Sequence, residues 1–161
     1  MKLLGSFIDT DKDITHRKCL LIGNMKNNRS LYSSKLVSMN VKLRHFDCYQ
    51  TSIFLYNCGL WTLNNSQELR LDAFHRRQLR YAIGFVYPKL ISNEELYRLT
   101  KQIPWSAVCR ERRLKLLGHI MRLHEQSPAA QALSNALQPA KAKIGRPKLT
   151  WLKLITQDLI T

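Results

Sequence analysis

The sequence predicts a mainly α-helical chain, a bundle-like fragment of about six or seven helices that follow one short N-terminal strand. Apolar residues recur every three or four positions along most of the chain, which is the spacing of one face of a helix. Residues that cap helices precede several of these stretches, and no convincing second strand follows the first. With 45% apolar residues in 161 positions, the composition is that of a folded chain rather than a disordered one.

Residues 3–9 form the predicted strand, and the acidic positions after them form a turn. A strand needs a partner, so the lack of a second strand indicates that the chain begins partway through a larger domain. Asp13 is placed to cap a first helix that runs to about Tyr32. The apolar face of this helix is flanked by Lys18, Lys26 and Arg29.

A pair of serines at positions 33 and 34 interrupts the helical pattern. Ser38 is then placed to cap a second helix, which is predicted to run from Met39 to about Cys58. From Phe46 onward the apolar residues lie on all sides of this helix, so we expect its second half to be buried.

A third helix is predicted to open at Asn64 and to end near Gly84, since glycine favours the position just after a helix. Four of its arginines fall within an arc of roughly 120°. Such an arc is usually a solvated face, but with a strongly basic chain it is also suited to contact with phosphate groups. These residues are Arg70, Arg76, Arg77 and Arg80.

A short fourth helix follows a loop that Pro88 closes. It begins after Ser92, which fits a capping box together with Glu95. Its buried side is predicted to consist of Leu96, Leu99 and Ile103.

The stretch from Pro104 to Leu123 is the helix around which the chain is organised. Proline suits the first turn of a helix, because its missing N–H has no partner there in any case. Apolar residues fall on two opposite faces, so we expect this helix to be packed between two layers. One face carries Trp105, Val108, Cys109, Leu116, His119, Ile120 and Leu123, and the other carries Leu114, Leu117 and Met121.

Basic residues occupy the remaining edges of this central helix. Arg112 is the exception, since it falls within the first apolar face and must extend to water, pair with another group or reach a ligand. The edge positions are Arg110, Arg113, Lys115 and Arg122.

Two further helices are predicted after the central one. Ser127 and Pro128 suit the cap and first position of a helix that reaches Leu137. Residues 139–148 form a basic loop, and Thr150 then caps a last helix. We expect this last helix to pack through Trp151, Leu154, Ile155 and Leu159.

Positive charge is the strongest global property. The 26 Lys and Arg residues against 11 Asp and Glu residues leave a formal net charge of +15. This excess predicts attraction to polyanions, nucleic acid first and an anionic membrane surface second. No run approaches the ~20 apolar residues of a membrane span, and no signal peptide is visible. The four cysteines contain no CxxC pair and are predicted to be mostly reduced core thiols of an intracellular protein.

Six short blocks, in order over nearly the whole chain, resemble the C-terminal part of the reverse transcriptase of non-LTR (LINE-type) retrotransposons. The central block resembles the R-R-L-x-x-L-G-H-x-x-R pattern of that family, and the last resembles its G-R-P-x-x-x-W pattern, here from Gly145 to Trp151. The blocks are LLGSFIDTDKDITHRK, SIFLYNCGLWTLN, FHRRQLRYAIG, ISNEELY, RRLKLLGHIMRL and GRPKLTWL.

The resemblance implies a thumb and the region beyond it, without the fingers and palm of a polymerase. Residues 1–13 would be the end of a palm-like strand and turn, and residues 14–103 a thumb-like helical region. Residues 104–161 would be a post-thumb helical region that includes the basic loop 139–148. One block departs from the family, whose usual Y-G-C-E-x-W is Tyr56-Asn57-Cys58-Gly59-Leu60-Trp61 here, which suggests a decayed genomic copy.

Catalytic residues are not expected in this chain. Reverse transcription needs carboxylates that hold two Mg²⁺ ions, and the family supplies them from the palm. The chain contains no Asp-Asp pair, so we expect no cofactor and no enzymatic activity from it alone, although the parent family is an RNA-directed DNA polymerase. The acids at positions 9, 11 and 13 lack the glycine and glutamate of a calcium loop. Zinc is not expected either, because of the spacing of Cys109, His119 and His124.

The predicted function is therefore binding of a primer–template or RNA–DNA hybrid through its backbone, without sequence specificity. Partners implied are nucleic acid and a separate chain that carries the palm, and the resemblance implies a nuclear location. The candidate contact residues are Arg70, Arg76, Arg77, Arg80, Arg112, Arg113, Lys115, Arg122, Arg146 and Lys148.

Two alternatives stay open at this point. The chain is a degenerate retroelement remnant without function, unable to fold without the missing palm. Alternatively, it is a helical module that binds a membrane surface or another protein. That second alternative needs a helix with a clean division into basic and apolar sides, and the two-sided central helix argues against it.

Overall fold

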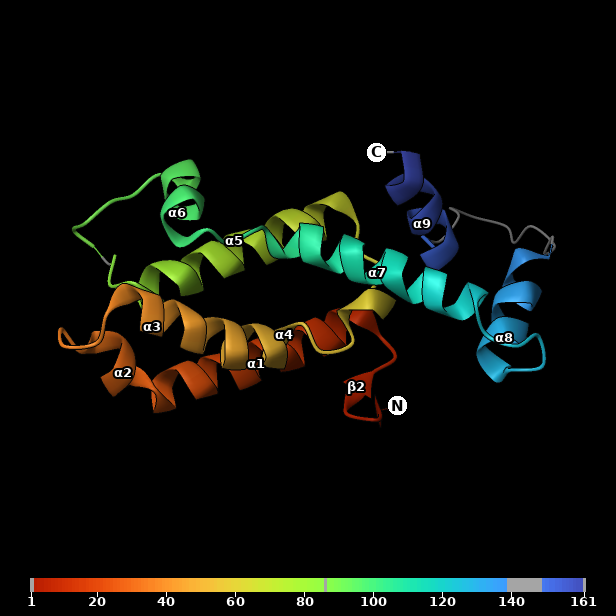
Figure 1. Cartoon of the computed structure of the whole chain (residues 1–161), viewed down its shortest axis with the longest axis horizontal. Helices are drawn as coiled ribbons and strands as arrows, with labels where there is room; N and C mark the ends of the chain where they lie inside the picture. The colour runs from red at the N-terminus through yellow and green to blue at the C-terminus, as the bar shows by residue number, and fades with distance from the viewer. Residues whose placement is uncertain (1, 86, 139–148, 161) are drawn as a thin grey trace.

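The computed structural model describes residues 2–85, 87–138 and 149–160, and it confirms the mainly α-helical class. Figure 1 shows α1, the α3–α4 segment and α5 side by side, with α7 leading from this group toward α8 and α9. The α-helices are α1 (Thr10–Asn27), α2 (Arg29–Ser33), α3 (Met39–His45), α4 (Ser52–Phe54), α5 (Asn65–Ala82), α6 (Asn93–Thr100), α7 (Trp105–Met121), α8 (Pro128–Leu137) and α9 (Trp151–Ile160).

The N-terminal extended segment is a minimal hairpin. Strand β1 (Lys2–Leu3) pairs antiparallel with β2 (Ser6–Phe7). Leu4 and Gly5 join them with positive φ angles of 46° and 83°, as in the tight turn that suits a two-residue hairpin. The strand expected over residues 3–9 thus turns back on itself. The inference of a larger domain rested on a missing partner strand, and this pairing removes that basis.

The first helix begins earlier than predicted, because Asp9 and not Asp13 caps it. The Asp9 carboxylate accepts a hydrogen bond from the backbone N–H of Lys12 at 2.9 Å. Asp13 lies one turn inside α1, buried, where it accepts hydrogen bonds from Phe7 N and Trp61 Nε1. Both acids fit the cap position by residue type. The hydrogen bonds from Phe7 and Trp61 hold Asp13 inside the structure and leave the cap position to Asp9.

The second predicted helix ends near Phe54, short of Cys58. Ser38 caps α3 as expected, and α3 continues through a π-helical segment (Phe46–Thr51) into α4. The chain then turns through Asn57, a left-handed residue with φ 62°, into the 3-10 turn η2 (Cys58–Leu60). Asparagine tolerates this conformation better than most residues, so the helix stops here.

Other predicted ends are confirmed. Asn64 caps α5 in a reciprocal capping box with Gln67, and Gly84 follows the helix with φ 78°. Ser92 caps α6, and Ser127 caps α8. Lys101 adopts a left-handed conformation and ends α6, so Ile103, expected on its buried side, lies outside the helix and is 54% exposed.

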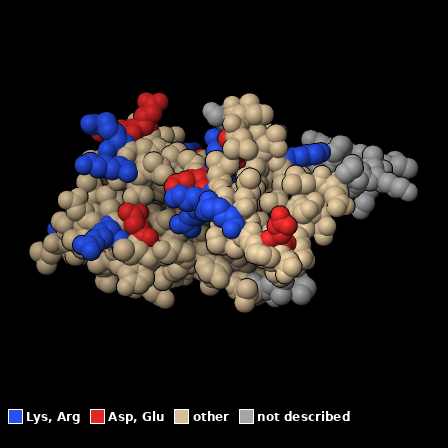
Figure 2. Space-filling view, turned by 45° about the vertical axis from the view of Figure 1, so that its right-hand side comes forward, with Lys and Arg blue, Asp and Glu red and all other residues tan. Residues whose placement is uncertain are grey.

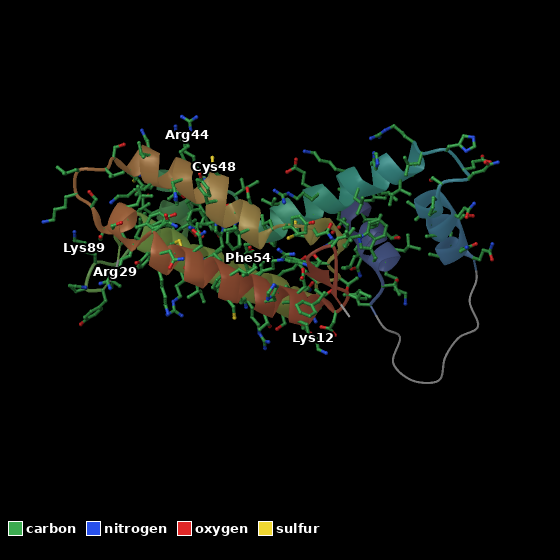
Figure 3. The ribbon with its side chains drawn as sticks, turned by 90° about the horizontal axis from the view of Figure 1, so that it is seen from below. Lys12, Arg29, Arg44, Cys48, Phe54 and Lys89 are labelled. Atoms are coloured by element: carbon green, nitrogen blue, oxygen red, sulfur yellow. The ribbon has the colours of Figure 1, made fainter. Side chains whose placement is uncertain are left out.

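Trp105, at the start of α7, packs against side chains of the helices that come before it in the chain. Its ring stacks on Phe54 of α4 at 4.5 Å and on His75 of α5 at 4.3 Å between ring centroids. Figure 3 shows Phe54 directed into the interior. One core cluster therefore includes residues from α1 to α7, and the predicted regions 14–103 and 104–161 meet in it.

The expectation that α7 is packed between two layers is wrong, because only one face of the helix is buried, in its first half, while Ala107 and Glu111 on the opposite side are exposed. Trp105, Cys109 and Arg113, four residues apart, are buried. From Leu114 onward the apolar side chains are half-buried or exposed, and Met121 is 70% exposed. The second half of α7 extends beyond α5 and meets α8 and α9 instead (Figure 1).

His75 is an uncharged member of this core. It is fully buried, and neither ring nitrogen has a hydrogen-bond partner among the described residues. Burial, with a smaller contribution from the charge of Arg76, lowers the pKa of His75 to about 3. The unfolded chain therefore takes up a proton below its ordinary pKa of 6.5, while the folded chain stays neutral until about pH 3.

We expect acidification from pH 6 to pH 5 to lower the free energy of unfolding by about 1 kcal/mol through His75 alone. The variant His75→Phe, which matches the aromatic neighbours, removes this part of the pH dependence. Urea melts of the wild type and of His75→Phe at both pH values measure it. An unchanged slope in His75→Phe contradicts the assignment.

Candidate nucleic-acid interface

The arginine arc of α5 lies opposite its buried side, but its members divide between two neighbours. Arg80 is half-buried and donates hydrogen bonds to Ile91 O at 3.1 Å and Asn93 Oδ1 at 2.7 Å. Arg76 is half-buried beside Tyr97 of α6. These two arginines therefore hold α6 and the loop before it against α5.

The other half of the arc faces α1. Arg77 is exposed and lines a groove between α1 and α5 with a volume of about 260 Å³. Arg70 is exposed two helical turns earlier on the same side of α5. We call this hollow the α1/α5 groove, and it is lined by Ile22, Met25, Lys26, Phe74, Arg77, Gln78 and Tyr81.

Cations stand on both sides of the α1/α5 groove. Lys26 comes from α1 and Arg77 from α5, and none of the seven lining residues is acidic. Lys18, two turns before Lys26, places its ammonium 5.4 Å from the centre of the Phe74 ring. The floor between the cations is apolar and aromatic, and Phe74 and Tyr81 are both half-buried.

The contact residues predicted from the sequence lack Lys18 and Lys26, although both lysines flank the apolar face of the first predicted helix. Their spacing of eight residues, about two helical turns, was the available signal. What the sequence lacked was the pairing of α1 with α5. Only that pairing sets these lysines opposite Arg77.

The basic residues of α7 are mostly engaged within the protein. Arg112 donates a hydrogen bond to Leu55 O at 2.7 Å. Lys115 forms an exposed ion pair with Glu111 at 2.6 Å. Arg122 is exposed at the end of the helix. The α7 edge is therefore a weaker candidate for phosphate contact than the predicted set implies.

Arg113 has to be removed from the contact set. Its side chain is completely buried, and it forms an ion pair with Asp158 of α9. Its guanidinium also donates to Trp61 O at 3.4 Å. Arg110 shares the same carboxylate at 3.2 Å. The helical spacing placed Arg113 on an exposed edge, but α9 covers that edge.

Two predicted contact residues, Arg146 and Lys148, lie outside the described residues. On the face drawn in Figure 2, Lys and Arg side chains form separate groups with acidic side chains beside several of them. That face carries no single continuous basic band. The α1/α5 groove, where cations from two helices flank one hollow, is therefore the better candidate for contact with a nucleic-acid strand.

The described residues meet neither the requirements of a metal site nor those of a membrane-spanning helix. No three or more His, Cys, Asp and Glu side chains gather there in a way that could hold a metal ion. Among the helices of this part of the chain, none has the length and apolar content to cross a membrane.

Removing the charge of Asp158 leaves the buried Arg113 without its carboxylate. We expect Asp158→Asn to lower the free energy of unfolding by about 3–5 kcal/mol, because an unpaired buried cation is strongly unfavourable. Urea-melt midpoints followed by circular dichroism measure the loss. Glu111→Gln removes the same charge from an exposed ion pair and should leave the midpoint nearly unchanged. Equal midpoints for the two variants contradict the role given to Asp158.

No protein-family model, no curated protein and no solved structure matches this chain. A function therefore has to be inferred from its own residues and from the sequence blocks described above.

Proposed function

We propose that this chain is the thumb and post-thumb part of a LINE-type reverse transcriptase and binds the backbone of a primer–template or RNA–DNA hybrid without reading its sequence. Two features support this proposal. The first is the set of six sequence blocks that resemble that family in order. The second is the net charge of +15, which favours a polyanionic partner.

The α1/α5 groove is the observation that carries the binding proposal. Lys26 and Arg77 flank it from two helices, with Lys18 and Arg70 farther along the same sides. Cations on opposite sides of a groove can contact successive phosphates of one strand. The apolar floor at Phe74 and Tyr81 offers contact area for sugars.

Such contacts explain binding that does not depend on sequence. Lysine and arginine side chains neutralise phosphates and release the counterions that the nucleic acid had bound, and this gain is the same for every base. Sequence is read instead through hydrogen bonds to base edges, and long, exposed side chains in a shallow groove position the strand without specifying it.

The chemical step belongs to another chain or region in this proposal. The Mg²⁺ ions of the parent polymerase need a set of converging carboxylates. The residues described here do not fit that requirement, since they contain no such group of three or more potential ligands. The partner would be a palm-bearing reverse-transcriptase chain, acting with this one in the nucleus. The three-region division at residues 1–13, 14–103 and 104–161 stays a prediction.

Charge reversal in the groove tests the proposal. We expect Lys26→Glu/Arg77→Glu to weaken binding to a labelled RNA–DNA hybrid by at least about tenfold and to reduce the slope of log affinity against log salt by roughly two. Fluorescence anisotropy across a salt series measures both quantities. Single-stranded RNA and duplex DNA are run alongside, and the hybrid is expected to bind most tightly.

Arg44→Glu/Lys153→Glu is the matched control, with the same change of charge at exposed residues of α3 and α9. Figure 3 shows Arg44 on α3 pointing away from α1. Equal loss of affinity in both double variants would show that net charge alone drives binding. Binding no stronger than that of a scrambled peptide of equal charge, with a broad non-cooperative urea melt, would favour a remnant without function.

A further inference from the structure

Two of the four cysteines lie together in the interior, where η2 meets α7. Cys58 belongs to η2 and Cys109 to α7, and both are completely buried, as predicted for core thiols. Their thiols lie close enough for each to shift the pKa of the other. Cys19 and Cys48 are exposed, against the expectation for most cysteines, and Figure 3 shows Cys48 on the outer side of the π-helical segment.

The close approach of two backbone segments brings the Cys58–Cys109 pair together. Asn57, in its left-handed conformation, turns the chain so that η2 lies against α7. The fit leaves little room for a larger residue after Cys58, since a Cβ atom at Gly59 would lie 3.1 Å from Arg112 O. The two cysteines are therefore held on facing segments of a tightly packed junction.

A guanidinium stands beside the pair. Arg112 Nη1 lies 3.9 Å from Cys58 Sγ, and its hydrogen bond to Leu55 O holds it in place. The neighbouring Cys109 thiol and the positive charge of Arg112 lower the pKa of the Cys58 thiol, although burial opposes them. The pKa of the Cys109 thiol is raised by the neighbouring Cys58 thiol and by burial. Cys58 is thus the better nucleophile of the two, and Cys109 keeps its proton.

We propose that Cys58 and Cys109 form a reversible oxidation site, at which hydrogen peroxide converts the two thiols into a disulfide. Two thiols held at one tightly packed junction need little rearrangement to bond. A cation beside one of them favours its thiolate, which is the reactive form of a cysteine. Nothing in the proposed binding function requires this pair, so the two proposals stand independently.

The reaction balances in two steps. The Cys58 thiolate attacks one oxygen of hydrogen peroxide and breaks the O–O bond, which gives a sulfenic acid and, after protonation, one water. Cys109 then attacks the sulfenic sulfur, the S–S bond forms, and the hydroxide leaves as a second water with the Cys109 proton. Two electrons pass from the sulfurs to the peroxide, and a dithiol reductant reverses the change.

The bond would tie η2 to α7. It would also fix the turn that contains Gly59. The carbonyl oxygen of Gly59 accepts a hydrogen bond from Trp151 Nε1 at 2.8 Å. The oxidised chain should therefore resist unfolding better than the reduced one, because the cross-link restricts the unfolded state.

Peptide mapping of the full chain tests the proposal. The protein is treated with graded hydrogen peroxide, its free thiols are alkylated after unfolding, and the digest is analysed by mass spectrometry. We expect a linked peptide that contains Cys58 and Cys109, lighter by two hydrogen atoms than its parts and released by dithiothreitol. The variant Cys19→Ser/Cys48→Ser should give the same linked peptide and a higher urea midpoint after oxidation.

The role of Arg112 is tested by the rate of disulfide formation. Arg112→Gln should slow it about fivefold or more at neutral pH, because less of Cys58 is thiolate, and should move its pH profile upward. Arg122→Gln, on the exposed end of the same helix, is the control and should react at the wild-type rate. Alkylation of both Cys58 and Cys109 as free thiols, at peroxide concentrations that oxidise Cys19 and Cys48, would overturn the proposal. Oxidation of Cys58 to a sulfinic acid without a linked peptide would also overturn it.

Discussion

Burial of the Arg113 guanidinium is the constraint on which the C-terminal half of this structure depends. A cation removed from water is strongly unfavourable unless a carboxylate and further acceptors surround it. Asp158 and the carbonyl of Trp61 supply these groups from positions 45 and 52 residues away. The chain after α7 must therefore return to the middle of the molecule. That return places α9 against α7 and lets Trp151 reach the carbonyl of Gly59.

A second buried ion pair organises the N-terminal half in the same way. Arg17 lies 3.7 Å from Asp13 and donates to Gly5 O in the hairpin turn, while Asp13 accepts from Trp61 Nε1. Trp61 thus stands between the two ion pairs, with its side chain on Asp13 and its carbonyl on Arg113. Some of the basic side chains of this chain therefore serve folding, and the number of Lys and Arg residues overstates how many cations an external polyanion would meet.

The α1/α5 groove and the Cys58–Cys109 pair share one origin. Each forms where helices distant in sequence come together, and each joins residue types that are ordinary when taken singly. Lysines that flank an apolar face become one side of a basic groove because α5 brings Arg77 opposite them. A buried cysteine becomes part of a thiol pair because η2 packs tightly on α7.

The sequence by itself determined the helical class, most helix starts and the overall excess of positive charge, because caps and apolar spacing act within a few residues. Ser38, Asn64, Ser92 and Ser127 all cap helices as their residue types predict. Only the tertiary structure decided that Asp9 caps α1. It also decided that Arg113, on one edge of α7, is buried under α9 instead of exposed. It also decided which arginines of α5 stay free. Burial and pairing depend on neighbours far along the chain, and no local pattern records which helix will cover a given face.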